Sequence, residues 1–172
     1  MDTNEVSLKV VCDTGPIIHL DELGCLHLLN DFKEILIGPT VRNEVQRNRQ
    51  NVSSRIKLQI AEGSLKTPTN PTLLAMCRAF SLDAGEIECL TIMESVPDAM
   101  FLTDDAAARL VAERMGFNVH GTMGIILRSL RRRQMELKEV LDILESMPLK
   151  SSLFIRPSLL EEIKLKVRRE FR

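Results

Sequence analysis

Five carboxylates stand beside apolar segments of the chain, where an ionised side chain is hardest to accommodate. They are Asp13, Glu44, Glu86, Asp104 and Asp105. Acids that converge within a few ångströms cannot all stay ionised unless some protonate or a cation lies among them. An oxygen-only cluster without His or Cys suits Mg²⁺ or Mn²⁺. Such an ion is typically shared between protein carboxylates and substrate phosphate, so the pattern predicts phosphate chemistry at a divalent-metal site.

Each acid taken alone has a simpler interpretation. Asp83 could cap the helix that follows it, with Glu86 three residues on as in a capping box. Asp105 could likewise cap the helix after Asp104. The joint pattern favours the metal site, because two acids follow strands and two acids, Glu44 and Glu86, are expected in the first turns of helices.

The elements that must position these acids alternate along the chain. Apolar runs at 8–12, 34–38, 99–105 and 117–120 predict strands. Helical spacing or helix-start residues predict helices at 17–32 with an interruption at Gly24, 39–48, 52–63, 71–80, 82–96, 106–116, 121–134, 136–147 and 156–171. This alternation predicts an α/β fold with a parallel sheet covered by helices on both faces. In such sheets ligands bind at the carboxyl ends of the strands, which is where Asp13 and Asp104 fall.

Composition narrows the class of protein. The 172 residues suit one domain, 1–172, and the 44% hydrophobic content supplies an aliphatic core, since Trp and Tyr are absent. The formal net charge of −1 gives no bulk case for nucleic acid. The four cysteines show no CxxC spacing, so we expect them to be small buried apolar residues rather than disulfide partners. No His joins them at ligand spacing, which disfavours a zinc site. No secretory pattern or bilayer-length apolar run is present, so we expect a cytoplasmic protein without a membrane partner.

Polar residues around the acids are secondary candidates for substrate binding. Thr14 and Thr103 could hydrogen-bond a phosphate or a metal-held water, or could serve local turns. Thr122 could hold a phosphate at a helix start or act as an ordinary N-cap. Arg42 and Arg47, which flank Glu44, are the favoured phosphate contacts among basic runs that otherwise suit solvated helix faces. Arg109, one helical turn after Asp105, is expected in a structural ion pair.

Five motifs together resemble the PIN-domain ribonucleases, and most closely a prokaryotic branch related to VapC-type toxins. They are "VVCDTGPIIHL", "PTVRNEV", "LDAGEIECLTI", "FLTDDAAARLVAERMGF" and "VHGTMGIIL". The resemblance covers residues 8–133 and implies a three-layer fold with a central sheet of four to five strands. It implies a Mg²⁺- or Mn²⁺-dependent site that hydrolyses single-stranded RNA. By position, the four acids of the family match Asp13, Glu44, Glu86 and Asp104, with Asp105 as an accessory metal ligand.

The chain departs from the toxins in three ways: Gly15 and Pro16 follow Thr14, the third acid is Glu rather than Asp, and helices over 134–172 extend the core. The sequence leaves two candidate functions open. One is a metal-dependent endoribonuclease, as the toxin of a toxin–antitoxin pair with an antitoxin partner. The other is a non-catalytic PIN-like module that binds nucleic acid or protein. The apolar helix faces at 124–130 and 139–144 either support a homodimer or complete the core.

Overall fold

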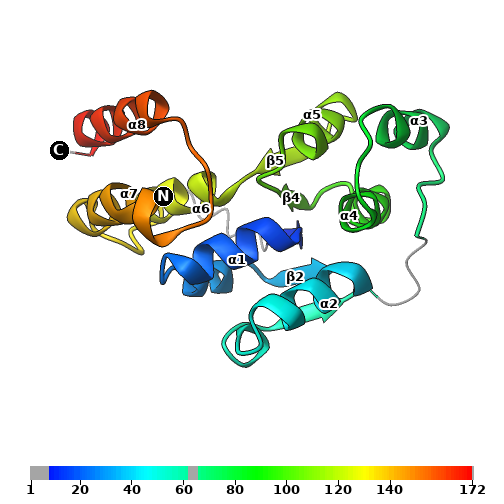
Figure 1. The fold of residues 1–172 in the computed structure, drawn as a ribbon, viewed down its shortest axis with the longest axis horizontal. Helices are drawn as coiled ribbons and strands as arrows, with labels where there is room; N and C mark the ends of the chain where they lie inside the picture. Colours follow the sequence, from blue (N-terminus) through cyan, green and yellow to red (C-terminus); the bar gives the residue numbers. More distant parts are fainter. Residues whose placement is uncertain (1–7, 62–65, 172) are drawn as a thin grey trace, which may run out of the picture.

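The computed structural model of the chain describes residues 8–61 and 66–171. Figure 1 shows the order of its elements. They are β1 (Lys9–Cys12), α1 (Thr14–Glu22), η1 (a 3₁₀ turn, Leu26–Asp31), β2 (Glu34–Ile37), α2 (Pro39–Asn48), η2 (a 3₁₀ turn, Val52–Ser54), β3 (Leu58–Ile60), α3 (Pro71–Ala79), α4 (Ala84–Ser95), β4 (Met100–Leu102), α5 (Ala106–Arg114), β5 (Asn118–His120), α6 (Thr122–Arg131), α7 (Leu137–Lys150) and α8 (Pro157–Glu170).

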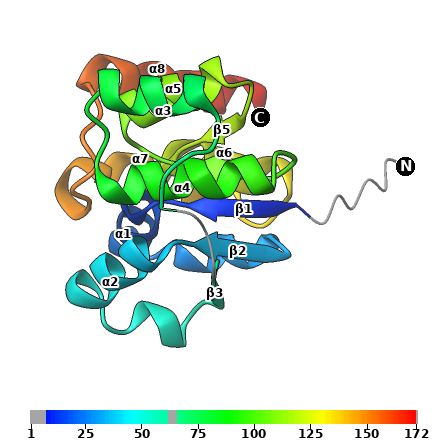
Figure 2. The ribbon, with the colours of Figure 1, turned by 90° about the vertical axis from the view of Figure 1, so that its right-hand side faces the viewer.

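The five strands form one parallel sheet in the order β3-β2-β1-β4-β5. Helices cover it on both faces, with α6 on the opposite side of the strands from α4 and α5 (Figures 1 and 2). Val10, Val11 and Phe101 are fully buried, as expected for central strands covered on both sides. The predicted α/β architecture is confirmed, and the strand that precedes Asp13, β1, lies at the centre of the sheet.

The segment between α2 and α3 differs from the prediction. We expected a helix over 52–63, but the chain forms the short turn η2 and then β3, which pairs with β2 through Ile35↔Leu58 and Ile37↔Ile60. Residues 62 and 63 of the expected helix lie outside the described residues. Strand β3 is three half-buried residues at the edge of the sheet, so pairing with β2 decides its structure against its local pattern.

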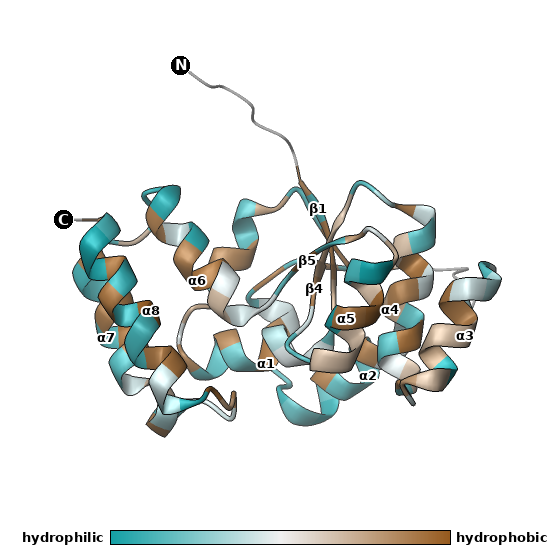
Figure 3. Cartoon of the chain, turned by 90° about the horizontal axis from the view of Figure 1, so that it is seen from above, coloured by the Kyte–Doolittle hydropathy of each residue, from teal (hydrophilic) through white to brown (hydrophobic). Residues whose placement is uncertain are grey.

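The C-terminal helices contribute to the same apolar core as the sheet. Val140 and Leu144 of α7 and Leu160 of α8 belong to the buried cluster that also holds the residues of β1 and β4. Figure 3 shows hydrophobic and hydrophilic bands alternating along α7 and α8, as expected for helices with one buried face. The four cysteines are buried and unpaired, as predicted. No helix among the described residues is both long and apolar enough to cross a bilayer.

A buried acid fixes the start of α2. Oε2 of Glu88, which is almost fully buried on α4, accepts a hydrogen bond from the amide of Thr40 at 2.8 Å. This amide is among the first in α2, which have no partner within the helix. Gly38, the residue before α2, leaves the space for this carboxylate, because a Cβ built there would lie 2.6 Å from Glu88 Cγ.

We therefore predict that Gly38→Ala destabilises the protein by about 1–3 kcal/mol, as overpacking of a filled site does. The buried Glu88 cannot move aside without losing its hydrogen bond to α2. Chemical denaturation measures the effect. Gly15→Ala is the matched control, since a Cβ there meets no atom closer than 3.6 Å and alanine favours the helix α1. Equal unfolding free energies for Gly38→Ala and the wild type would contradict the steric argument.

Candidate active site at the carboxyl edge of the sheet

The pairing of β1 with β4 brings Asp13 and Asp104 to one edge of the sheet. Cys12 lies opposite Leu102 in the parallel register, and the amide of Asp13 donates to the carbonyl of Leu102 at 2.9 Å. Asp13 and Asp104 therefore lie at the same edge of the sheet, as predicted, and Asp13 is hydrogen-bonded to Thr103, the residue before Asp104.

Asp13 is a buried carboxylate held by two donors. Only 9% of it is exposed, its Oδ1 accepts from the amide of Thr14 at 2.8 Å, and its Oδ2 accepts from the hydroxyl of Thr103 at 3.2 Å. Burial raises the pKa of Asp13 to about 6, because the two hydrogen bonds only partly offset the loss of hydration. The charges of Asp83 and Glu44 raise the same pKa further. Asp13 is also the N-cap of α1, so the same residue caps a helix and supplies a buried acid at the edge of the sheet.

Glu44 reaches this edge from the second turn of α2, not from the first turn as predicted. The helix begins at Pro39, so Glu44 is its sixth residue, and the contribution of the helix dipole is weaker there. Its Oε2 accepts a short hydrogen bond from the hydroxyl of Thr14. A Cβ built on Gly85 would lie 3.8 Å from Glu44 Oε1, which places this carboxylate beside the start of α4.

Glu86 and Asp83 form a reciprocal capping box at the start of α4. The amide of Asp83 donates to Glu86 Oε2 and the amide of Glu86 donates to Asp83 Oδ1, each at 2.9 Å. Burial raises the pKa of Glu86 to about 7, although the hydrogen bond from Asp83 opposes the rise. The charges of Asp83, Asp105 and Asp13 add to it. The first-turn position of Glu86 is confirmed. The acidic cluster also contains Asp83, which the sequence analysis considered only as a cap.

Asp105 caps α5 and adds its charge to this cluster. Its Oδ1 accepts from the amide of Ala108 at 2.8 Å, and its own amide donates to the hydroxyl of Thr103 at 3.2 Å. The capping role that was considered for Asp105 is present. Since the charge of Asp105 also raises the pKa of Glu86, the two carboxylates lie within electrostatic reach of each other.

Asp104 has a different environment, because its charge is already compensated. Its Oδ2 lies 2.7 Å from Nδ1 of His19 and accepts from the hydroxyl of Thr122 at 2.5 Å, while its Oδ1 accepts from the amide of Thr122 at 2.8 Å. Burial alone would raise the pKa of Asp104, but these hydrogen bonds and the charge of His19 outweigh burial and lower it. His19 was not among the predicted site residues; a single polar side chain inside the apolar stretch "PIIHL" is the signal that was available.

Thr122 is not the N-cap that the sequence suggested as one alternative. Gly121 occupies the cap position and Thr122 is the first residue of α6, with its hydroxyl turned to Asp104 instead of the helix. A Cβ on Gly121 would lie 2.5 Å from Asp104 Oδ1 and 3.1 Å from the carbonyl of Thr103. Only glycine therefore allows the chain to pass this close to Asp104.

The other predicted substrate contacts have distinct surroundings. The hydroxyls of Thr14 and Thr103 are bound to Glu44 and Asp13, so both threonines orient acids. Arg42 is half-buried on α2, and its Nε is enclosed without a hydrogen-bond partner among the described residues. Arg47 is exposed in the last turn of α2, roughly 12 Å along the axis from Pro39 at 1.5 Å per residue. Their phosphate-binding roles stay predictions.

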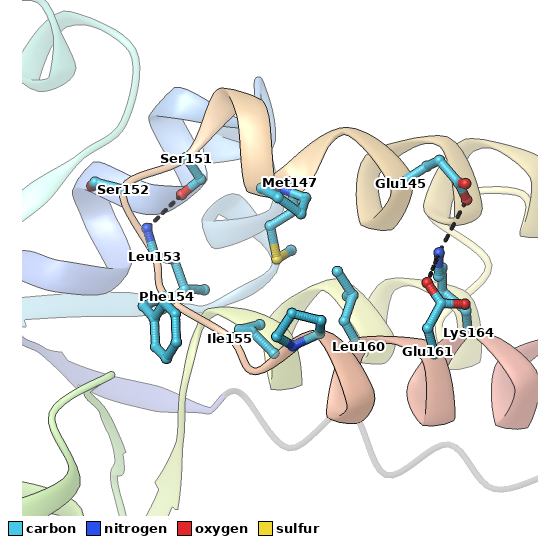
Figure 4. A pocket seen from close by; sticks show the side chains of 12 residues that line it. Glu145, Met147, Ser151, Ser152, Leu153, Phe154, Ile155, Leu160, Glu161 and Lys164 are labelled. Atoms are coloured by element: carbon cyan, nitrogen blue, oxygen red, sulfur yellow. Dashed lines mark hydrogen bonds and ion pairs between the residues drawn. The ribbon is translucent and has the colours of Figure 1, made fainter.

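A separate pocket lies away from these acids, between α7, α8 and the segment joining them (Figure 4). It has a volume of about 550 Å³ and is lined by apolar side chains such as Met147, Phe154 and Leu160. Lys164 closes one end through ion pairs with Glu145 and Glu161. None of the predicted site residues lines it, so the chemistry-bearing residues belong to the sheet edge.

Fold and site together define a class: a parallel α/β domain with an acidic cluster at the carboxyl edge of its central strands. Residues 9–169 match a family model described as a PIN domain, and the chain belongs to this family. The match includes the helices α7 and α8 beyond residue 133. No curated protein matches the chain significantly. Membership in the PIN family indicates a nuclease-type, hydrolytic function.

The raised pKa of Asp13 predicts that its carboxyl destabilises the folded protein above about pH 6. With a pKa of about 6 when folded and 3.8 when unfolded, this group binds more protons in the folded state between these values, so the free energy of unfolding falls as the pH rises through them. Asp13→Asn removes this loss. Relative to the wild type, its unfolding free energy should rise by about 1–3 kcal/mol between pH 4 and pH 8.

The measurement is urea denaturation at a series of pH values in a buffer with EDTA. Because both proteins share every other titrating group, their difference reports the charge of Asp13 together with its effect on Glu86. Asp98→Asn is the control, because it removes a carboxylate that is exposed and not buried. A difference between Asp13→Asn and the wild type that does not change with pH would show that burial does not penalise the charge of Asp13.

Proposed function

We propose that this protein is a divalent-metal-dependent endoribonuclease that hydrolyses phosphodiester bonds of single-stranded RNA. The observation that supports this most is the acidic cluster around Asp13 and Glu86, two carboxylates whose pKa values are raised by burial and by other acids at the same edge. Uncompensated buried acids are costly to folding and are typical of functional sites. The nuclease-type function of the family agrees with this choice.

The donor chemistry of the cluster fits a hard divalent cation. Among the described residues, no Lys or Arg forms an ion pair with Asp13, Glu86 or Asp105. The oxygens offered are those that Mg²⁺ and Mn²⁺ prefer. The residues that would hold the ion are Asp13, Glu44, Glu86, Asp104 and Asp105. When bound, such an ion supplies positive charge for the phosphate oxygens and makes a water more acidic.

The residues of the chain prepare this chemistry in specific ways. Thr14 and Thr103 fix the two oxygens of Asp13 at a strand end, which limits its motion. His19 and Thr122 hold Asp104 in one orientation. Protons and cations compete for Asp13 and Glu86, so metal affinity should weaken as the pH falls below about 7. In this proposal RNA is the substrate, and an antitoxin protein is a further partner if the chain acts as a toxin.

One observation favours a second candidate, a non-catalytic binding module. Within the described residues, no three His, Cys, Asp or Glu side chains converge closely enough to hold a metal ion. A module that kept these acids for stability or partner docking would need no such convergence. Calorimetric titration with Mn²⁺ separates the candidates: binding that Asp104→Asn removes supports the nuclease, and absence of binding by the wild type supports the module.

The nuclease proposal predicts that Asp13→Asn lowers Mn²⁺-dependent cleavage of single-stranded RNA by at least about 100-fold, because a central charge at the phosphodiester is lost. The fold survives, since asparagine has nearly the same shape. Cleavage of a fluorescent RNA in gel assays measures the effect, with Asp98→Asn as the matched control at an exposed site. Equal cleavage by Asp13→Asn and the wild type would remove Asp13 from the mechanism.

A further inference from the structure

A cation stands at the same edge of the sheet as the acids. Arg109 lies on α5, and its Nη2 donates to the carbonyl of Thr103 at 3.2 Å. A Cβ built on Gly121 would lie 2.9 Å from this Nη2 and 2.5 Å from Asp104 Oδ1. The two groups are thus at most about 5.4 Å apart, the sum of these two distances. The guanidinium therefore adjoins Asp104, although no ion pair joins them in the described structure.

Thr103 fixes where this cation stands relative to Asp13. The hydroxyl of Thr103 donates to Asp13 Oδ2, and its carbonyl accepts from Arg109. Thr103 is fully buried at the end of β4 and cannot shift without disturbing the sheet. The distance between the first acid of the site and the guanidinium is consequently set by one rigid residue.

Among the described residues, Arg109 uses only a small part of its hydrogen-bonding capacity. A guanidinium has five N–H donors, and the carbonyl of Thr103 takes one. The structural ion pair expected for this residue is present, but its N–O distance to Glu113 is 4.0 Å and both side chains are exposed, so it contributes little. With 36% of its side chain exposed, Arg109 can offer the remaining donors to a ligand at the edge.

The charge around the edge is asymmetric, and Arg109 lies on its less negative side. On the α4 side, in addition to burial, the charges of Asp83, Asp105 and Asp13 raise the pKa of Glu86, and those of Asp83 and Glu44 raise the pKa of Asp13. Next to β4 and β5, by contrast, His19 compensates Asp104. There burial lowers the pKa of His120, and the charges of Arg109, Arg131 and Arg128 lower it further. A polyanion meets less repulsion there.

We infer that Arg109 binds a phosphate of the RNA strand next to the scissile phosphodiester, so that the strand crosses the edge on the side of β4 and β5. The planar fork of a guanidinium matches two phosphate oxygens, which an ammonium group cannot match in the same way. This inference deepens the proposed function and rests on it. It assigns to Arg109 a contact with substrate in addition to its structural hydrogen bond.

The experiment measures RNA binding without cleavage. A short single-stranded RNA with 2′-O-methyl groups is titrated with protein in EDTA at salt concentrations from about 50 to 200 mM, and fluorescence anisotropy gives the affinity. Arg109→Gln keeps a donor for the carbonyl of Thr103 but removes the charge. Loss of one phosphate contact should flatten the slope of log K against log salt by about 0.7.

Two variants serve as comparisons. Arg114→Gln, on the same helix and exposed, should keep the wild-type slope. Arg109→Lys keeps the charge and should keep the slope while binding more weakly at every salt concentration, because the fork is lost. In cleavage assays Arg109→Gln should raise KM more than it lowers kcat, as expected when binding to substrate and transition state is lost equally.

The outcomes separate this inference from the proposed function. A wild-type protein that neither binds nor cleaves RNA overturns both. A wild-type protein that cleaves RNA while Arg109→Gln keeps the full salt slope and KM overturns the role of Arg109 alone. An equal loss of slope in Arg114→Gln would mean that Arg109 contributes only to a diffuse field, which also overturns the specific contact.

Discussion

The parallel pairing of β1 with β4 is the constraint on which the site depends. It sets Cys12 opposite Leu102, and from that register follow the hydrogen bond of the Asp13 amide and the contact between Asp13 and Thr103. A shift of one residue would turn these fully buried side chains to the wrong face, so the aliphatic core specifies the register strongly. The same packing that stabilises the fold therefore holds two acids together at one edge, where α1, α5 and α6 also begin.

The acids at this edge have two different electrostatic environments, one around Asp104 and one around Asp13 and Glu86. Around Asp104 the protein supplies its own compensation through His19 and Thr122, and the carboxylate is easier to ionise than an ordinary one. Around Asp13 and Glu86 it supplies mainly other acids, and both carboxyls keep their protons to higher pH. The buried charges of the second arrangement cost folding free energy, although Asp13 and Glu86 also cap helices. The cation site proposed above would account for it, because an ion would provide the missing charge only when it is bound.

The sequence was sufficient for features with strong local signals. Short apolar runs identified the central strands, and the acids that follow them were predicted at the carboxyl ends of the strands. Strand β3 was missed because three half-buried edge residues show no usable alternation. Glu44 was predicted in the first turn of its helix, although counting from Pro39, where the helix begins, places it in the second turn. The pair of His19 and Asp104 was not predictable, since 85 residues separate them and only the pairing of β1 with β4 brings the segments after these strands together.

Thr103 shows how a small buried residue can organise a charged surface. It donates to Asp13, accepts from the amide that begins the cap of α5, and presents its carbonyl to Arg109. Its own amide is bound to the carbonyl of His120, which ties the β4 end to β5. Asp13, the start of α5 and Arg109 are thus all hydrogen-bonded to Thr103. Because Thr103 is fully buried and its amide is bound to β5, the spacing between negative and positive groups is built into the fold, and a ligand with matching charges needs little rearrangement of this residue to bind.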